Sequence, residues 1–426
     1  MRPRRAGMVC IIRLHRLDTL TAAFAMGNDI PAWSERPAAI SQIAKLDLDS
    51  TGAVCLNLIT EKLTLSIAAA DTLAARLKGF FVMSACDSID YSPAVLGILL
   101  TARCNISCRH CCNCSGPEAE GAVKLEFITG LIDDAVRIGS IREVGLSGGE
   151  PFLFLDLVGA TLRHARGHGL GASVTTNGFW GRSARADRML DDLRVDGLTA
   201  LCISTSQFHQ EFIRLNTVVA AAAASRRAGL ATTVNVVASA GVQPDTIRDA
   251  LGDLAGDVGI VVMPCLPTGR AAAKVDAREW PGLTAQPLGN CRYHFQKLAV
   301  DLAGDVWPCC SPGGFTPALQ LGNANRTPID RIVARAADSP LLAVLDAVGP
   351  AYFLPFLRGA GLADAFPDRF ADQCHLCHAM LSDPHAASVV EAACRQLAGE
   401  VSQMAAPERP VGRIATIAAT QESASV

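Results

Sequence analysis

The sequence predicts an α/β fold, a partial TIM-like (β/α)6 barrel carrying a small C-terminal domain and an N-terminal extension. From about Val95 the chain alternates short apolar runs with amphipathic stretches of helical period. Such alternation is typical of parallel βα units. The pattern contains six strands and no sign of two more, which favours a partial barrel over a full one. A doubly wound open sheet is the structural alternative. In a barrel of this kind the loops after the strands carry the chemistry.

Each unit of the predicted barrel can be assigned in chain order. The expected strands are Val95–Leu100, Glu143–Leu146, Ala172–Thr175, Ala200–Ser204, Thr232–Ala238 and Gly259–Met263. The expected helices between them are Leu125–Ile138, Leu155–His168, Ser183–Val195, Thr217–Ala228 and Pro244–Leu254. The repeat stops after Pro264, so we assign residues 91–270 to the barrel.

Residues 1–90 precede the barrel as an N-terminal extension. Within it, Ala53–Ile59 and Lys62–Ile67 are predicted as two short strands. Asp71 is a suitable N-cap for a helix that continues through Arg76. The extension is therefore expected to contain a small β-β-α unit.

Residues 271–402 are expected to form a smaller C-terminal domain. Lys297–Val300 and Asp305–Trp307 are predicted to pair as a hairpin, and Pro384–Gly399 is a predicted helix. Pro and Gly punctuate the region between these elements, which favours short helices. The tail, residues 403–426, is expected to be disordered.

The composition excludes several classes of protein. The 426 residues carry a net charge of -3, so nothing in the charge balance favours electrostatic binding of nucleic acid. Half of the residues are hydrophobic and 19% are charged, which argues against a mainly disordered chain. No apolar run approaches the roughly 20 residues of a membrane-spanning helix. The basic start is followed by too short an apolar run for a signal peptide. We expect a cytoplasmic protein.

Ten of the sixteen cysteines fall into two groups. Five lie within residues 104–114, and five more are Cys291, Cys309, Cys310, Cys374 and Cys377. In a long chain from a reducing compartment, clustered cysteines favour metal binding over a disulfide framework. The grouping predicts two metal sites.

The first group has the spacing of an iron–sulfur site. Cys104, Cys108 and Cys111 follow the first barrel strand within one short loop. Three thiolates spaced in this way can converge on one iron–sulfur cube and leave one metal corner unfilled. The alternative is a zinc knuckle whose fourth ligand is Cys112, Cys114 or His110.

This loop resembles the CxxxCxΦC motif of the radical S-adenosylmethionine (radical SAM) superfamily. His110 stands where the family usually has an aromatic residue, which is a mild departure. The resemblance implies a [4Fe–4S] cluster on Cys104, Cys108 and Cys111, with SAM bound at its open iron. It also implies a low-potential electron donor such as ferredoxin or flavodoxin, because reduction of this cluster releases a 5′-deoxyadenosyl radical from SAM. That chemistry belongs to the cofactor, which the protein positions and shields.

The ends of the later strands carry further motifs of the same family. Leu146 is followed by the sequence SGGEP, and the family's GGE motif binds the SAM amino group. Glycines let a backbone approach a ligand closely, and a glutamate is a charge-assisted partner for an ammonium group. The resemblance implies cofactor contacts for Ser147, Gly148, Gly149, Glu150, Asn177 (within the sequence TTNG), Ser204 and Met263. Asn235 lies midway along the fifth strand, where a polar residue has no obvious role in the core, so it is a further candidate to face the nucleoside. A structural role is the alternative for Ser204, Asn235 and Met263.

The second cysteine group resembles the SPASM and twitch domains that follow some radical SAM barrels. A cysteine, a hairpin and a GxxxxC segment open such domains, and the CxxC pair then supplies two more thiolates. The implied ligands of one auxiliary [4Fe–4S] cluster are Cys291, Cys309, Cys374 and Cys377. Position 383 is Asp, which favours the shorter twitch form. A structural zinc site with His375 or His378 is the alternative, and Cys310 could replace Cys309.

The loop after the fourth strand offers candidate catalytic residues. His209 and Glu211 are expected at the barrel mouth, where they could contact substrate or act as acid and base. Both could equally be surface residues at the start of the next helix.

The family resemblance implies a radical reaction that begins with abstraction of a substrate hydrogen atom. Relatives with SPASM or twitch extensions are often peptide maturases, so we expect a precursor peptide as substrate and a C–H cross-link or related change as product. The alternatives are a small-molecule radical SAM dehydrogenase and a non-catalytic metal-binding or regulatory protein. Neither nucleic acid nor a membrane is expected as a partner.

Overall fold

The computed structural model describes residues 91–240, 244–281, 289–291, 296–362, 366 and 369–405. The predicted N-terminal β-β-α unit lies outside the described residues, as do residues 406–426 of the predicted tail. The last helix reaches Ala405, six residues beyond its predicted end.

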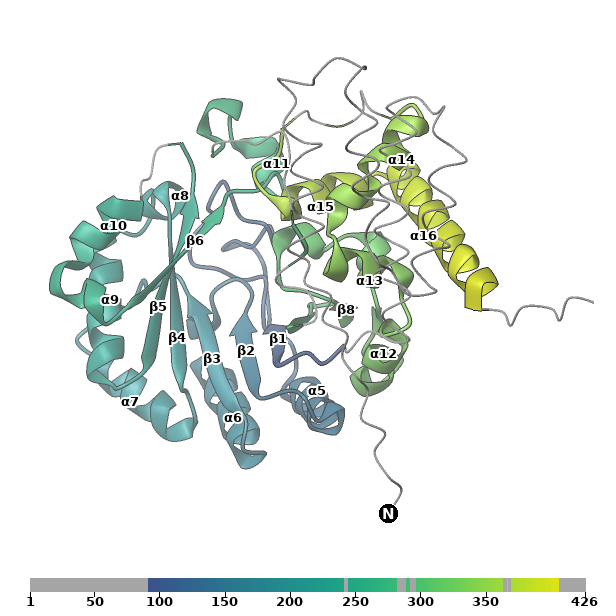
Figure 1. The fold of residues 1–426 in the computed structure, drawn as a ribbon. Helices are drawn as coiled ribbons and strands as arrows, with labels where there is room; N and C mark the ends of the chain where they lie inside the picture. The colour runs from purple at the N-terminus through teal and green to yellow at the C-terminus, as the bar shows by residue number, and fades with distance from the viewer. Residues whose placement is uncertain are drawn as a thin grey trace, which may run out of the picture. The chain divides into compact units, whose positions relative to one another are not determined.

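Nine strands form one sheet in the order β6-β5-β4-β3-β2-β1-β7-β8-β9. Neighbouring strands from β6 to β1 are parallel, as the βα pattern predicted (Figure 1). This arrangement confirms the mixed α/β fold with a parallel sheet. The strands are β1 (Val95–Leu99), β2 (Glu143–Ser147), β3 (Gly171–Thr176), β4 (Ala200–Thr205), β5 (Ala231–Ala238), β6 (Gly259–Pro264), β7 (Lys297–Val300), β8 (Asp305–Trp307) and β9 (Gly322–Asn323).

Five helices connect the parallel strands and lie along one side of the sheet (Figure 1). They are α5 (Leu125–Ile138), α6 (Leu155–Gly167), α7 (Ala186–Asp196), α9 (Leu215–Arg227) and α10 (Pro244–Leu251). A short helix, α8 (Gln207–Gln210), follows β4, and α11 (Ala271–Lys274) follows β6. Single 3-10 turns are Pro151–Leu153, Gly252–Gly256, Ala277–Glu279, Pro312–Gly314, Pro317–Leu319 and Pro350–Phe353.

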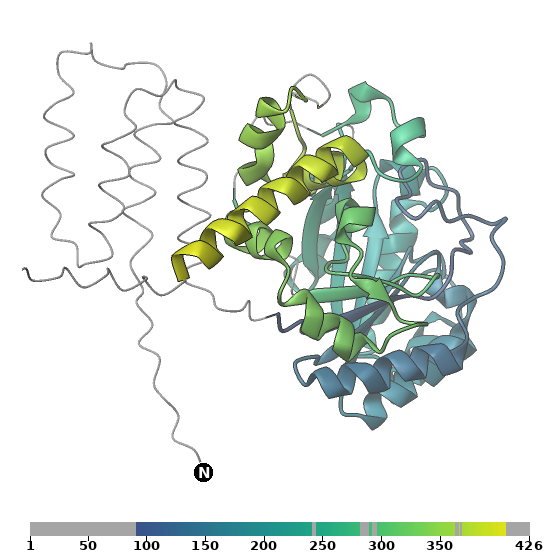
Figure 2. The same ribbon diagram turned by 90° about the vertical axis from the view of Figure 1, so that its right-hand side faces the viewer.

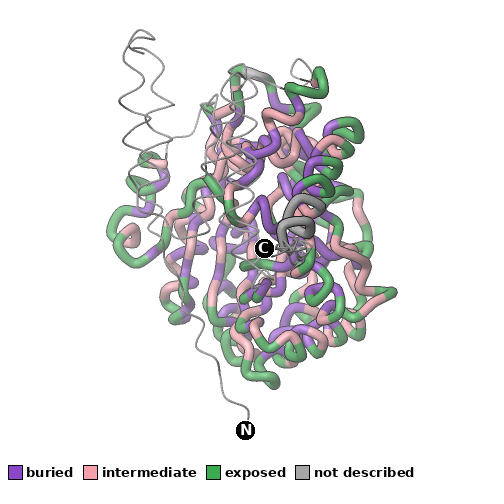
Figure 3. Tube along the Cα trace, turned by 45° about the vertical axis from the view of Figure 1, so that its right-hand side comes forward, coloured by how far each residue is buried: buried purple, intermediate pink, exposed green. Residues whose placement is uncertain are grey.

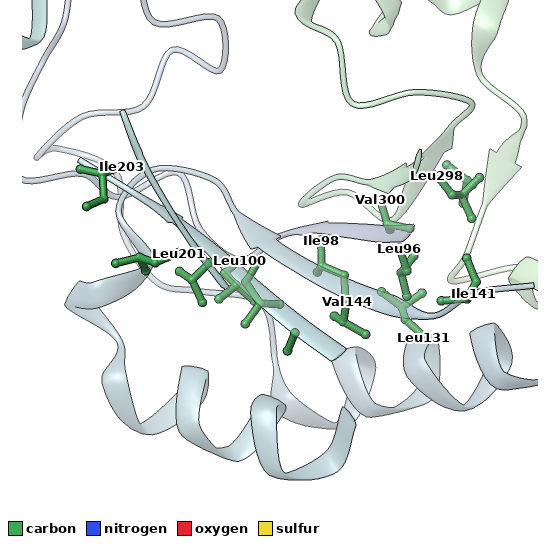
Figure 4. Close-up of a cluster of buried hydrophobic side chains, with 14 of the residues drawn as sticks. Leu96, Ile98, Leu100, Leu131, Ile141, Val144, Leu201, Ile203, Leu298 and Val300 are labelled. Atoms are coloured by element: carbon green, nitrogen blue, oxygen red, sulfur yellow. The ribbon is translucent and has the colours of Figure 1, made fainter. Parts of the chain in front are cut away.

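The two faces of the parallel sheet differ in burial. Leu96, Ile98 and Val144 point toward the helices and are almost completely inaccessible, beside Leu131 of α5 (Figure 4). Residues of the opposite face, such as Gly145, are only half-buried. Figure 3 shows the same contrast, with buried segments inside and exposed ones on the outer helices. The helix-facing side chains therefore form the core, and the other face is left accessible for a site.

The C-terminal part continues the barrel sheet. β7 pairs with β1 in parallel, and β8 and β9 follow as antiparallel neighbours, which includes the predicted hairpin. The helices of this part are α12 (Ile329–Ala336), α13 (Pro340–Ala347), α14 (Leu354–Gly359), α15 (Gln373–Ser382) and α16 (Pro384–Ala405). Helix α16, yellow in Figure 2, packs across α13, α14 and α15.

Within the described residues no single helix has the length and apolar character needed to cross a membrane. One pair of helical segments, Pro340–Ala347 with Pro350–Gly359, meets those criteria only when its two parts are combined across a bend of 114°.

Candidate active site

The first cysteine group lies in a tightly bonded loop at the carboxyl end of β1. Cys104 and Cys108 are buried, and Cys111 is half-buried. The Ser115 amide lies 3.3 Å from Cys111 Sγ and donates to it. The guanidinium of Arg270 donates to the carbonyl oxygens of Cys108 and Ser115, both at 2.7 Å. The loop is thus held from within and by a residue that follows the last barrel strand.

Gly269 brings the segment after β6 into backbone contact with this loop. Its φ is +55°, which favours glycine, and a Cβ here would lie 2.2 Å from the carbonyl oxygen of Cys112. The Arg270 amide then donates to the carbonyl oxygen of Cys111 at 2.9 Å. The sequence analysis linked neither Gly269 nor Arg270 to the cysteine loop. The PTGR sequence at residues 267–270 was the signal that could have indicated this contact.

The SGGE segment packs directly on the backbone before Cys104. Ser147 is half-buried and its carbonyl oxygen accepts from the Leu100 amide. A Cβ on Gly148 would lie 2.5 Å from the carbonyl oxygen of Thr101, and one on Gly149 would lie 2.1 Å from that of Arg103. No side chain fits at either position, so the two glycines allow this strand end to reach the cysteine loop.

Glu150 is fully buried and accepts three hydrogen bonds. The donors are the Phe152 amide at 3.0 Å, the Thr176 hydroxyl at 2.7 Å and the Asn177 amide at 2.8 Å. Burial raises the pKa of Glu150 to about 7, although the hydrogen bonds act in the opposite direction. No side-chain cation in the described part of the chain bonds to this carboxylate. An ammonium group would supply the missing charge.

Asn177 connects Glu150 to the cysteine loop. Its side-chain Nδ2 donates to Asn105 Oδ1 at 2.8 Å and lies 3.7 Å from Cys104 Sγ. The structure therefore brings together Glu150, Asn177 and Cys104, which were predicted from three separate motifs.

The remaining predicted cofactor residues lie on neighbouring strands. Ser204 of β4 is in register with Asn235 of β5, and both are half-buried. Asn235 Oδ1 is shielded from solvent and has no hydrogen-bond partner among the described residues. A buried acceptor without a donor is suited to a ligand hydroxyl or amino group. Met263 is half-buried near the end of β6.

His209 faces the cysteine loop. Its Nδ1 lies 2.8 Å from the Ser206 hydroxyl, and its ring meets the ring of His110 edge to face, with centroids 4.6 Å apart. His110 in turn stacks on Phe208, with centroids 4.9 Å apart. Burial lowers the pKa of His110 to about 4 and holds that of His209 well below its usual value. Both rings are therefore neutral near pH 7.

Glu211 is engaged in an ion pair. The guanidinium of Arg109, within the cysteine loop, lies 2.8 Å from Glu211 and 2.8 Å from Glu279, and stands over the Phe208 ring. Glu279 is 170 residues from Arg109 in sequence, and no sequence pattern indicated their contact. The network connects the cysteine loop with the segments after β4 and β6.

The second cysteine group converges on one cavity. Its lining includes the four predicted ligands and two glycines, whereas Cys310, His375 and His378 are not part of it. A Cβ on Gly314 would lie 2.2 Å from Cys309 Sγ, and one on Gly313 would lie 2.3 Å from the carbonyl oxygen of Cys374. The four lining thiols are Cys291, Cys309, Cys374 and Cys377.

This donor set fits an iron–sulfur cluster. Four thiols suit a [4Fe–4S] cluster or a zinc site with four cysteine ligands, and the candidate histidine ligands of a mixed zinc site, His375 and His378, do not line the cavity. His375 Nδ1 accepts from the Ala371 amide at 3.1 Å, and His378 Nδ1 lies 3.1 Å from the Ser382 hydroxyl.

Comparison with known protein families identifies the domains that contain the two cysteine groups. Residues 98–254 match the radical SAM superfamily, and residues 291–339 match SPASM, an iron–sulfur cluster-binding domain. The chain thus contains a radical SAM domain and a C-terminal SPASM domain, whose cofactors are SAM, a SAM-binding [4Fe–4S] cluster and an auxiliary iron–sulfur cluster. The SPASM match includes Cys291 and Cys309 and ends before Cys374.

Three similar proteins illustrate the range of relatives. YydG of Bacillus subtilis (strain 168), named as a peptide biosynthesis protein, is 24% identical over 67% of this chain and 92% of its own. GTP 3′,8-cyclase of Paenarthrobacter nicotinovorans is 30% identical over 26% of this chain and 31% of its own. The structure of Streptococcus suis SuiB bound to precursor peptide SuiA is 13% identical, covers 78% of each chain and has a TM-score of 0.38.

Proposed function

We propose that this protein is a cytoplasmic maturase that modifies a ribosomally synthesised precursor peptide, forming a C–H cross-link or a related change. The observation that carries the proposal is the similarity to YydG, which extends over 92% of that peptide biosynthesis protein and so includes more than the SAM-binding core. The four-thiol cavity of the C-terminal part agrees with an enzyme that uses a second cluster.

The residues around β1, β2 and β3 are assigned to the radical-generating site. Cys104, Cys108 and Cys111 hold the first cluster, and Glu150 binds the ammonium group of SAM, with its carboxylate oriented by three fixed donors. Ser147, Gly148, Gly149 and Asn177 shape the same end of the sheet, and Ser204, Asn235 and Met263 face the nucleoside. When bound, the cluster and SAM would supply radical chemistry that begins with loss of a hydrogen atom from the substrate.

The auxiliary site is assigned to Cys291, Cys309, Cys374 and Cys377. These residues hold one [4Fe–4S] cluster with no open iron, so this site suits electron acceptance from a substrate radical. A ferredoxin or flavodoxin supplies the electron to the first cluster.

His209 and Glu211 are proposed to act near the substrate through different properties. His209 is neutral near pH 7 because burial lowers its pKa, so it suits a hydrogen bond to the substrate better than the uptake of a proton. Glu211 forms an ion pair with Arg109, so we assign it the role of holding the cysteine loop in place rather than a role in proton transfer.

The test is anaerobic incubation of the reconstituted enzyme with SAM, dithionite and each candidate short peptide encoded by neighbouring genes. The expected result is 5′-deoxyadenosine together with a change in peptide mass, both absent from a Cys104→Ala variant. Deoxyadenosine formation that no such peptide stimulates would contradict the peptide assignment.

A small-molecule substrate is the second candidate, and the similarity to GTP 3′,8-cyclases favours it. That similarity covers about a third of the cyclase, however, whereas the one to YydG covers nearly all of that protein. Incubation with GTP in place of the peptide separates the two: a cyclised product would replace the peptide proposal. A non-catalytic protein would form no deoxyadenosine in either mixture.

A further inference from the structure

Two histidines and a carboxylate meet on the outer helices, away from both cysteine groups in sequence. Asp133 belongs to α5, His164 to the last turn of α6, and His168 caps the C-terminus of α6. Asp133 Oδ1 lies 2.8 Å from His164 Nε2 and 3.0 Å from His168 Nε2. One donor atom from each residue lies within 4.8 Å of the other two.

The helix geometry explains why these atoms converge. His164 and His168 are four residues apart, so they lie on one face of α6, and their rings meet with centroids 4.9 Å apart. α5 packs beside α6 (Figure 1). Asp133 of α5 contacts both rings. The three side chains are 31–49% exposed, so an ion can reach them from solvent.

The distances are close to those of a metal site. A tetrahedral zinc ion with ligands at about 2.0 Å holds its donor atoms about 3.3 Å apart. The two spacings between Asp133 and the histidines, 2.8 and 3.0 Å, are a few tenths of an ångström shorter, and the ligand atoms of the two histidines lie within 4.8 Å of each other, so side-chain rotations would admit an ion. Two imidazoles and one carboxylate suit zinc and neighbouring transition metals better than Mg²⁺ or Ca²⁺, which prefer all-oxygen sites.

The charges nearby do not oppose a cation. Arg137 lies one turn after Asp133, but its guanidinium is paired with Asp134 and with Asp330 of α12. The positive charge of Arg137 is therefore balanced, and a divalent ion at this position would be attracted by the carboxylate of Asp133.

We propose that Asp133, His164 and His168 form a binding site for a divalent transition metal such as Zn²⁺, with water at the open position. The bound ion would link α5 to α6 on the outside of the barrel. This site is independent of the proposed radical chemistry.

The experiment measures zinc in the anaerobically reconstituted holoenzyme, whose cluster cysteines are occupied by iron. After equilibration with Zn²⁺ and removal of free metal, the wild type should retain one more equivalent of zinc than a His164→Gln/His168→Gln variant. The matched control is His385→Gln, which replaces an exposed histidine of α16 and should retain zinc like the wild type. Iron, sulfide and SAM cleavage should be unchanged in both variants.

Equal zinc retention by the wild type and the double variant would overturn the proposal, as would no retention by either. Zinc held by the exposed Cys112 or Cys114 is recognised by X-ray absorption, since sulfur ligands lie near 2.3 Å and nitrogen or oxygen ligands near 2.0 to 2.1 Å. We expect only the shorter distances. If the double variant misfolds, Asp133→Asn provides the second comparison: Ni²⁺ should raise the melting temperature of the wild type and not that of Asp133→Asn.

Discussion

Glu150 is the only acidic side chain in the described part of the chain that is fully buried. Its three hydrogen-bond donors are two backbone amides and a hydroxyl, none of which carries a positive charge. A buried carboxylate without a cation is unfavourable, which is why its pKa rises to about 7. The site therefore holds an uncompensated acidic group next to Asn177 and the cysteine loop, where a ligand ammonium would stabilise it.

We predict that Glu150→Gln weakens SAM binding about 10- to 100-fold, because it removes a charge-assisted hydrogen bond worth about 1.5–3 kcal/mol. In the wild type, affinity should fall as the pH is lowered through about 7, since protonation removes the charge that attracts the ammonium group. Equilibrium binding of SAM between pH 6 and 8 measures both effects. A variant with wild-type affinity, or with the same pH dependence, would remove Glu150 from this role.

A second prediction for a single residue concerns Arg109. Its guanidinium forks between Glu211 and Glu279, a geometry that a lysine ammonium cannot reproduce. Arg109→Lys should therefore loosen the cysteine loop and shorten the lifetime of the first cluster in air by several-fold. It should hardly change the melting temperature, because exposed ion pairs stabilise folds weakly. Loss of the 400 nm iron–sulfur absorbance follows the lifetime, and an unchanged lifetime would contradict the assignment.

These residues also show where sequence reasoning reached its limit. The spacing of Cys104 and Cys108 and the position of Glu150 after a strand are local patterns, so they could be predicted. The contact of Arg109 with Glu279 depends on tertiary folding over 170 residues, and no periodicity encodes it. His209 was placed near the barrel mouth, but its edge contact with His110 follows from rotamers that the sequence does not display.

Among the elements, the parallel strands were predicted to within one residue at each end, because short apolar runs and turn residues mark them clearly. Helix α5 coincides with its prediction, whereas α7 begins at Ala186 rather than Ser183. A turn, in which the Ala186 amide donates to the carbonyl oxygen of Ser183, occupies those residues instead. Helix α11 was missed because it has only four residues and lies in a segment that reads as a loop.

The connection after β6 carries a prediction about the cysteine loop. Gly269→Ala should lower the iron bound at the first cluster, because its methyl group would lie 2.2 Å from the Cys112 carbonyl oxygen. Gly252→Ala is the matched control: its φ of +53° imposes similar backbone strain of about 1 kcal/mol, but nothing lies within 4 Å of the new methyl group. Iron analysis should show about half the wild-type content for Gly269→Ala and full content for Gly252→Ala. If both variants lost the same amount of iron, the cause would be backbone strain and not the contact of the new methyl group with the Cys112 carbonyl oxygen.

In the whole molecule, the two cysteine groups are expected to have different functions: the first supports SAM cleavage, and the second supports peptide modification through the auxiliary cluster. Replacing both Cys374 and Cys377 with Ala should remove the auxiliary cluster and leave about four of eight irons. SAM cleavage should then persist while peptide modification is largely lost, because the residues proposed to bind SAM lie on other elements. Quantification of deoxyadenosine against modified peptide tests this. Equal loss of both products would contradict the division.

The pairing of β7 with β1 has a consequence for truncation of the chain. The C-terminal part does not begin as an appendage on a finished barrel: its first strand covers the edge that β1 would otherwise present to solvent. Exposed strand edges promote association between chains. Deletion of everything after residue 270 would therefore create an aggregation-prone fragment rather than a minimal radical enzyme.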